Sequence, residues 1–148
     1  MTDLPSTARF ALPLLAMAQA QKEVTHNEAL TLLDALVQPV VEAGPLTAPP
    51  VSPVAGQGWI VGSGATGAWD GEDGALAVWT AGGWRFVGPR AGMRTHRLSD
   101  GAWLRFDGAT WVEPDTVASP AGGATTDSEA RAAIDAVILA LVGHGLLI

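Results

Sequence analysis

AQAQKEVTHNEALTLLDALVQ, residues 18–38, decides the N-terminal part of the fold because it predicts one amphipathic helix. Thr25 and Glu28 have the spacing of a capping box, which predicts a helix start between Gln21 and Thr25. Pro39 has no amide hydrogen to continue the helix, so the helix should end near Gln38. The apolar residues recur at helical spacing and form a wide stripe along one side: Ala29, Leu30, Leu33, Leu36, Val37 and Val40.

A longer run around this helix, from Arg9 to Val37, resembles the opening signature of DUF2793, a domain family of unknown function. The matching residues are Gln19-Ala20-Gln21-Lys22, Val24-Thr25-His26-Asn27-Glu28-Ala29-Leu30 and Leu33-Asp34, whereas Ala18 stands where the family usually has Gly. The family occurs in phage-like tail fibres, spikes and gene transfer agent particles. The resemblance therefore implies a structural protein of a virion or phage-like particle, assembled in the bacterial cytoplasm. It also implies a homo-oligomer, with a trimer favoured, that contacts other virion proteins such as the capsid vertex, fibre or baseplate.

The composition is compatible with an oligomeric structural protein. The chain has 148 residues, 48% of them hydrophobic and 16% charged, with a mean hydropathy of +0.25. We therefore expect a buried core and additional apolar surface that is covered between subunits. The net charge of −7 argues against nucleic acid as a partner, and no apolar run approaches the ~20 residues of a membrane helix. The absence of cysteine excludes disulfides and thiolate metal sites, and we expect no cofactor.

Proline-rich stretches divide the chain into an expected α+β arrangement. The sequence predicts an N-terminal arm and helix for attachment or oligomerisation (1–42), a small Trp- and Gly-rich antiparallel unit of β-hairpins (57–113) and a C-terminal oligomerisation helix (125–148). Linkers are expected at 43–56, which holds four prolines, and at 114–124.

An internal repeat defines the hairpins of the β unit. Asp73-Gly74-Ala75 precedes Trp79 and Trp84 at the same spacing at which Asp100-Gly101-Ala102 precedes Phe106 and Trp111. Each copy reads as a turn, a strand, a four-residue loop and a returning strand. The spacing places Trp79 opposite Trp84 and Phe106 opposite Trp111 as aromatic cross-strand pairs.

The C-terminal helix is apolar almost all round. Thr126 and Glu129 form a second capping-box pattern, and Arg131 is the main polar residue from Ala130 to Val142. A helix of this kind is buried, and we expect copies of itself or the first helix to cover it. The expected oligomer interface combines the two helices: Leu30, Leu33, Val37, Ile134, Val137, Ile138 and Leu141.

The sequence contains no recognisable catalytic or metal-binding set. The carboxylates of Asp70 and Asp107 adjoin glycine, which favours a role in their own turns. The same carboxylates leave open a glycoside hydrolase that assists in degrading cell walls. We expect a non-enzymatic protein.

Exposed tryptophans offer a second function, because sugars pack on aromatic rings while charged side chains hold their hydroxyls. The alternative reading is a carbohydrate-binding module that recognises cell-surface or capsular polysaccharide, and it is compatible with a spike that supports host adsorption. The expected sugar-binding residues are Trp103, Trp69, Arg105 and Asp107. Arginines crowd between Arg85 and Arg105, and they form either an anion-binding face or solvated strand edges paired with carboxylates.

Overall fold

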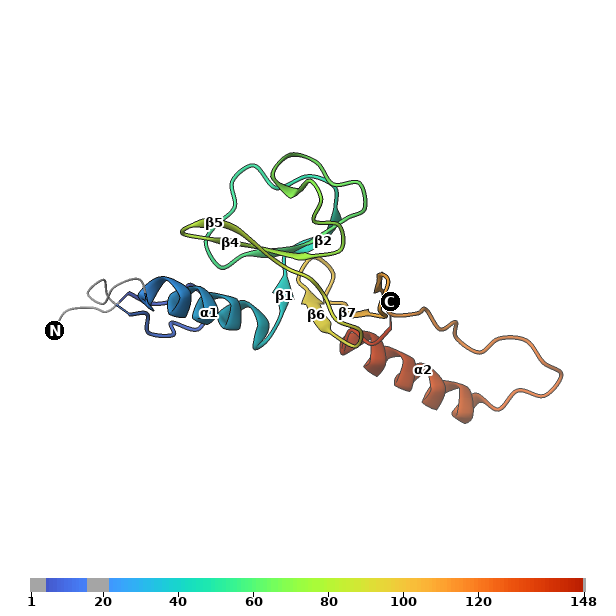
Figure 1. Cartoon of the computed structure of the whole chain (residues 1–148). Helices are drawn as coiled ribbons and strands as arrows, with labels where there is room; N and C mark the ends of the chain where they lie inside the picture. The colour runs from blue at the N-terminus through green and yellow to red at the C-terminus, as the bar shows by residue number, and fades with distance from the viewer. Residues whose placement is uncertain (1–4, 16–21, 148) are drawn as a thin grey trace.

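The computed structural model describes residues 5–15 and 22–147 and confirms the α+β class. Within these residues the chain forms two helices, α1 (Lys22–Leu36) and α2 (Ser128–Gly143), a short 3₁₀ turn (Gly67–Trp69) and two four-stranded sheets. Figure 1 shows the helices on opposite sides of the β structure, where neither packs on the other. The Gln19-Ala20-Gln21 part of the family signature lies outside the described residues.

The two sheets have the same plan. The first sheet has the order β2 (Ala43–Leu46), β3 (Gly58–Val61), β4 (Leu76–Thr80), β5 (Gly83–Val87). The second has the order β1 (Val40–Val41), β6 (Arg94–Arg97), β7 (Trp103–Phe106), β8 (Trp111–Val112). In each sheet the first two strands are parallel and the other pairs are antiparallel. The strands within residues 57–113 pair only in antiparallel fashion, as predicted, but they divide between two sheets, and each sheet gains a parallel edge strand from residues 40–46.

The predicted hairpin registers are confirmed. Trp79 lies opposite Trp84 in the β4–β5 hairpin, and Phe106 lies opposite Trp111 in the β7–β8 hairpin. The two copies of the sequence repeat fall in different sheets, so the repeat marks the two equivalent halves of the β structure.

A short extended segment joins both sheets. β1 pairs with β6 of the second sheet, and after the single residue Glu42 the chain continues as β2 on the first sheet. The linker was expected at 43–56, but residues 43–46 form β2, so the linker begins four residues further along the chain than predicted. Gly44 fits this segment because a Cβ there, at φ 132°, would lie 2.7 Å from the carbonyl oxygen of Ile60.

Two apolar clusters hold the sheets. One lies on the outer face of the first sheet, where Trp59, Trp69, Ala77 and their neighbours pack with Trp84. The other lies between the sheets and combines Ile60 and Leu76 with Val41 and Leu104. The indole N–H of Trp111 also donates to the carbonyl oxygen of Gly74 at 2.8 Å, which ties the second sheet to the first.

Both predicted capping boxes are wrong. α1 begins at Lys22, so Thr25 lies inside the helix, and the Glu28 carboxylate accepts from Arg85 Nε at 2.9 Å. In α2 the N-cap is Asp127, one residue after the expected Thr126, and its carboxylate accepts from the amide of Ala130. Asp can cap a helix as well as Thr can, so the pattern in the sequence allowed either residue.

Candidate oligomer surfaces and cleft

Helix α1 turns its polar side toward its own chain. The buried carboxylate of Asp34 accepts from Thr7 Oγ1 at 2.7 Å and from the amides of Arg9 and Phe10 at 2.8 Å. Asn27 exchanges two hydrogen bonds with the backbone of Leu15, at 2.9 and 3.0 Å. These two side chains bind residues 5–15 to α1, so the arm covers the polar side of the helix.

The apolar stripe of α1 consequently faces outward. Leu33 is 50% exposed, and Val37, directly after the helix, is 70% exposed. Leu30 is half-buried, and Leu36 packs at the edge of the cluster between the sheets. α1 therefore packs on its own domain only near its C-terminal end, at Ala35 and Leu36, and leaves Leu33 uncovered.

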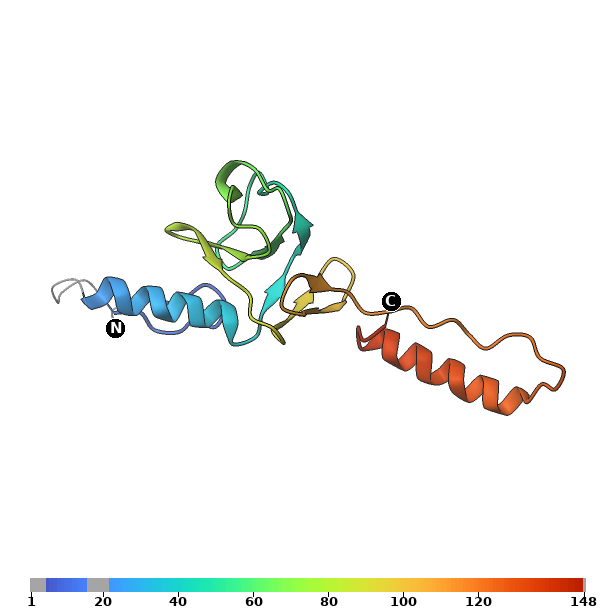
Figure 2. The same cartoon turned by 45° about the vertical axis from the view of Figure 1, so that its right-hand side comes forward.

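Helix α2 also leaves apolar side chains uncovered. Arg131 turns toward the segment before the helix and donates to the carbonyl oxygens of Pro120 and Gly122. Asp135 is half-buried, and one of its carboxylate oxygens is shielded from solvent. Figure 2 shows the segment before α2 running out alongside the helix and turning back into it. None of the α2 residues is buried, and Val137 and Leu139 are 59% and 71% exposed. Of the other expected interface residues, Ile134 is exposed, whereas Ile138 and Leu141 are half-buried.

Asp34→Ala is expected to free the arm from α1. Thr7, Arg9 and Phe10 lose a charged acceptor, so hydrogen exchange at the amides of Arg9 and Phe10 should accelerate about tenfold or more. Glu28→Ala is the matched control on the same helix, because it breaks only the exposed pair with Arg85. Slow exchange at both amides in the Asp34→Ala variant would contradict this role of the carboxylate.

A cleft of about 240 Å³ lies where the end of the chain meets the second sheet. We call it the Trp103 cleft, and its lining residues are Arg94, Trp103, Arg105, Val112, Glu113, Pro114, Asp115, Leu146 and Leu147. The cleft combines an aromatic ring, two arginines and two carboxylates. Two of the predicted sugar-binding residues, Trp103 and Arg105, therefore lie in one site.

The strand register and the α2 C-terminus position Trp103. His96 lies opposite Trp103 with the ring centroids 5.0 Å apart, and the His96 Nε2 atom is 3.1 Å from the carbonyl oxygen of Gly101. The amide of Trp103 donates to the carbonyl oxygen of Gly145 at 3.1 Å. Gly145 has φ 66°, and a Cβ there would overlap the Gly101 carbonyl oxygen, so only glycine fits this contact.

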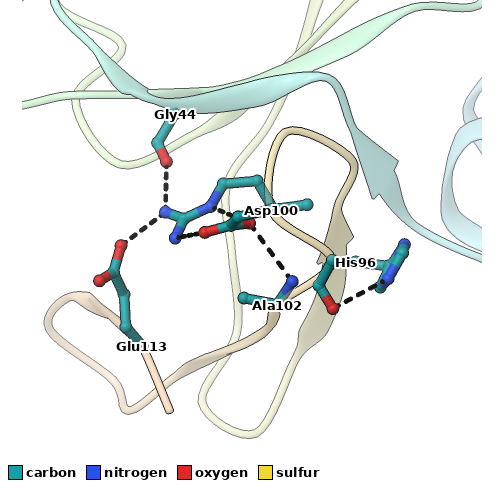
Figure 3. Close-up of polar contacts among 7 residues, drawn as sticks. Gly44, His96, Asp100, Ala102 and Glu113 are labelled. Atoms are coloured by element: carbon teal, nitrogen blue, oxygen red, sulfur yellow. Dashed lines mark hydrogen bonds and ion pairs between the residues drawn. The ribbon is translucent and has the colours of Figure 1, made fainter. Parts of the chain in front are cut away.

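Glu113 is held in the cleft wall by the buried Arg97 (Figure 3). The Arg97 guanidinium binds the carboxylates of Asp100 and Glu113, and it donates to the carbonyl oxygen of Gly44 at 2.8 Å. The Asp100 contact is the main cause that raises the pKa of Arg97, and the same contact lowers the pKa of Asp100. Arg97 thus joins both sheets and fixes one carboxylate of the cleft.

The other two predicted sugar-binding residues are elsewhere. Trp69 is fully buried, so its predicted exposure is wrong: its ring fills the cluster on the outer face of the first sheet. Asp107 lies in the β7–β8 loop and accepts from the amides of Ala109 and Thr110 at 2.8 Å. The Thr110 amide, followed by that of Ala109, lowers the pKa of Asp107. Asp107 thus has the turn role that the sequence favoured.

The arginine-rich segment divides between the two expected roles. Arg85 and Arg97 pair with carboxylates, whereas Arg94 and Arg105 lie directly opposite each other on β6 and β7 and line the Trp103 cleft. Sequence reasoning missed Arg94 and Glu113 as cleft residues. The hairpin register would have identified Arg94, but the contribution of Glu113 depends on its contact with Arg97.

A second cleft, of about 400 Å³, separates the arm and α1 from the β4–β5 hairpin. The pair between Glu28 and Arg85 crosses from the helix to the hairpin, and Val78 of β4 and Thr31 of α1 line the cleft on either side. This cleft was not predicted from the sequence.

Neither a metal site nor a membrane span is found in the part of the chain that the structure describes. In residues 5–15 and 22–147, no three His, Asp or Glu side chains lie together in a way that could hold a metal ion. None of the described helices combines the length and the apolar character that a bilayer crossing requires.

Comparison with known proteins gives one family. The family model described as "Protein of unknown function (DUF2793)" matches residues 26–112, which is more than half of the chain. The match runs from α1 to the end of β8, so it contains both sheets and leaves α2 outside. No curated protein matches the chain.

Proposed function

We propose, since this chain belongs to the DUF2793 family of proteins of unknown function, that it is a non-enzymatic structural protein that assembles from several copies. The proposed setting is a spike or fibre, or the base of one, on a tailed-phage-like particle or gene transfer agent. The observation that carries the assembly proposal is that both helices leave large apolar side chains exposed, whereas Asp34, Asn27 and Arg131 form hydrogen bonds within their own chain. The particle setting rests on where proteins of the family occur.

The exposed apolar side chains supply a driving force for assembly. Leu33, Val37, Val137 and Leu139 are each at least half exposed. Covering the exposed parts of these four side chains would contribute roughly 4–8 kcal/mol per chain, before the entropic cost of association. A symmetric contact between copies suits them, because one uncharged helix face can meet the same face of its neighbour around an axis. We propose a trimer.

Two variants test assembly in the full-length protein. Val37→Asp, directly after α1, and Val137→Asp in α2 should lower the mass of the oligomer by multi-angle light scattering, because each places a charge in the buried contact. Val51→Asp is the matched control, because Val51 is 100% exposed in the loop between β2 and β3. Circular dichroism should show all three variants folded. A wild-type monomer at micromolar concentration, or equal effects of all three changes, would count against assembly. Immunogold labelling of purified particles tests the particle setting.

A second candidate function is binding of cell-surface polysaccharide in the Trp103 cleft. The observation that favours it is the partly exposed Trp103 ring beside two arginines and two carboxylates. Titration with polysaccharide should change the tryptophan fluorescence of the wild type and leave that of Trp103→Ala unchanged. The two functions are compatible, because a spike can carry a sugar site.

We propose no hydrolase activity for the Asp70 and Asp107 carboxylates. A glycosidase needs one carboxyl group whose pKa is raised so that it can act as an acid. The pKa of Asp107 is lowered by its own turn, which opposes that role. Release of reducing sugar by the wild type, lost in Asp107→Asn, would revive the enzyme hypothesis.

A further inference from the structure

The Trp103 cleft contains a pair of arginines whose placement the fold does not explain. Arg94 and Arg105 are direct cross-strand partners on β6 and β7, and both are exposed. Like charges in this position destabilise a sheet. Among the described residues neither arginine forms an ion pair with a carboxylate, in contrast to Arg85 and Arg97. An anionic group held between the two guanidinium groups would remove the repulsion and make charge-assisted hydrogen bonds.

The remainder of the cleft selects the kind of anion. Glu113 and Asp115 lie in the same lining, and their carboxylates would accept hydroxyl hydrogens but would repel a dense polyanion such as nucleic acid. The side chains of Trp103, Leu146 and Leu147 supply apolar surface for the carbon atoms of a sugar ring. The ligand that satisfies all three features has one carboxylate, several hydroxyls and an apolar ring face.

The size of the cleft limits how much of the ligand it holds. Its volume of about 240 Å³ is below the roughly 300–1,000 Å³ of pockets that enclose a drug-sized molecule. It therefore suits one sugar ring of a longer chain.

We infer that the Trp103 cleft binds a uronic-acid residue of a polysaccharide, with its carboxylate between Arg94 and Arg105 and its hydroxyls toward Glu113 and Asp115. This inference rests on the second candidate function, sugar binding, and not on assembly. It adds the charge of the ligand and the pair of residues that select for it.

The experiment compares one sugar in two charge states. The full-length protein is titrated with the trisaccharide of galacturonic acid and with its methyl ester, which has the same rings but no charge, and binding is followed by calorimetry. The wild type should bind the acid about tenfold or more tightly than the ester. Arg94→Gln and Arg105→Gln should each abolish that preference. Arg90→Gln, an exposed arginine outside the cleft, should retain it.

Each result decides a separate claim. Equal binding of acid and ester by the wild type overturns the inference and leaves sugar binding standing, whereas binding of neither overturns both. Equal affinity for a single-stranded DNA oligonucleotide also overturns it, because attraction to any anion would then account for the binding. A second measurement needs no ligand. Arg105→Gln should raise the thermal midpoint of unfolding slightly, because it removes the repulsion between Arg94 and Arg105. A lower midpoint would contradict the claim that the two arginines repel each other.

Discussion

Trp69→Ala is expected to lower the free energy of unfolding by about 3–5 kcal/mol, because it empties the middle of a packed aromatic cluster. The Trp69 side chain is fully buried, and its ring lies edge-on to Trp84 with the centroids 5.2 Å apart. Trp84 in turn contacts Trp59 and Trp79, so the loss should loosen the outer face of the first sheet. Urea denaturation followed by circular dichroism measures the change.

Two further substitutions sharpen the Trp69 experiment. Trp69→Phe should cost less than Trp69→Ala, because it retains a ring and removes an indole N–H that finds no acceptor among the described residues. Trp103→Ala is the matched control for an indole at the surface and should cost no more than about half as much as Trp69→Ala. Equal losses from Trp69→Ala and Trp103→Ala would mean that the two rings are buried to the same extent, contrary to the structure.

The error over Trp69 shows where sequence reasoning stops. The neighbours Asp70 and Gly71 mark a turn, and a turn predicts exposure. The turn is present, but it folds the side chain of Trp69 back over the sheet, and only the tertiary structure determines that direction. The hairpin registers were predictable because they depend on local spacing: four residues separate Trp79 from Trp84, although Thr80 and Gly83 also pair, so the loop has two residues and not the expected four.

In α1 as well, the sequence did not determine the direction in which the side chains face. Periodicity identified the apolar stripe of α1 from the sequence, but it did not determine whether the stripe faces the core or the solvent. The structure determines it through Asp34 and Asn27, which bind the arm to the opposite side of the helix. Both residues belong to the stretch that carried the family resemblance, yet their role depends on contacts with residues 5–15.

The shared segment between the sheets was not visible in the sequence pattern. β1 and β2 have two and four residues, and β2 contains Pro45, which argued for a linker. Strands this short have no measurable alternation, and their pairing with β6 and β3 joins segments that are far apart in the chain. The sequence repeat indicated two hairpins within one β unit, and in the structure each hairpin became the end of a separate sheet.

Arg97→Met is expected to lower the free energy of unfolding by about 2–3 kcal/mol and to loosen one sheet relative to the other. Arg97 is buried on β6, and its guanidinium holds Asp100, Glu113 and the Gly44 carbonyl of the first sheet. Methionine retains much of the apolar stem, so the loss reports mainly the polar contacts. Arg90→Met, at an exposed position, should change stability by less than about 0.5 kcal/mol.

The pH dependence of the stability difference between the wild type and Arg97→Met shows how much the carboxylate partner Asp100 contributes to it. Arg97 lowers the pKa of Asp100 below its ordinary 3.8 in the folded protein. The stability from this pair is therefore fully present above pH 3.8 and is lost as the pH falls through the lower folded pKa. The gap between wild type and Arg97→Met should be constant near neutral pH and narrow below pH 3.8. If the difference in free energy of unfolding between the wild type and Arg97→Met stays the same at low pH, it arises from the hydrogen bond to the Gly44 carbonyl oxygen, because a carbonyl group does not gain a proton in this range.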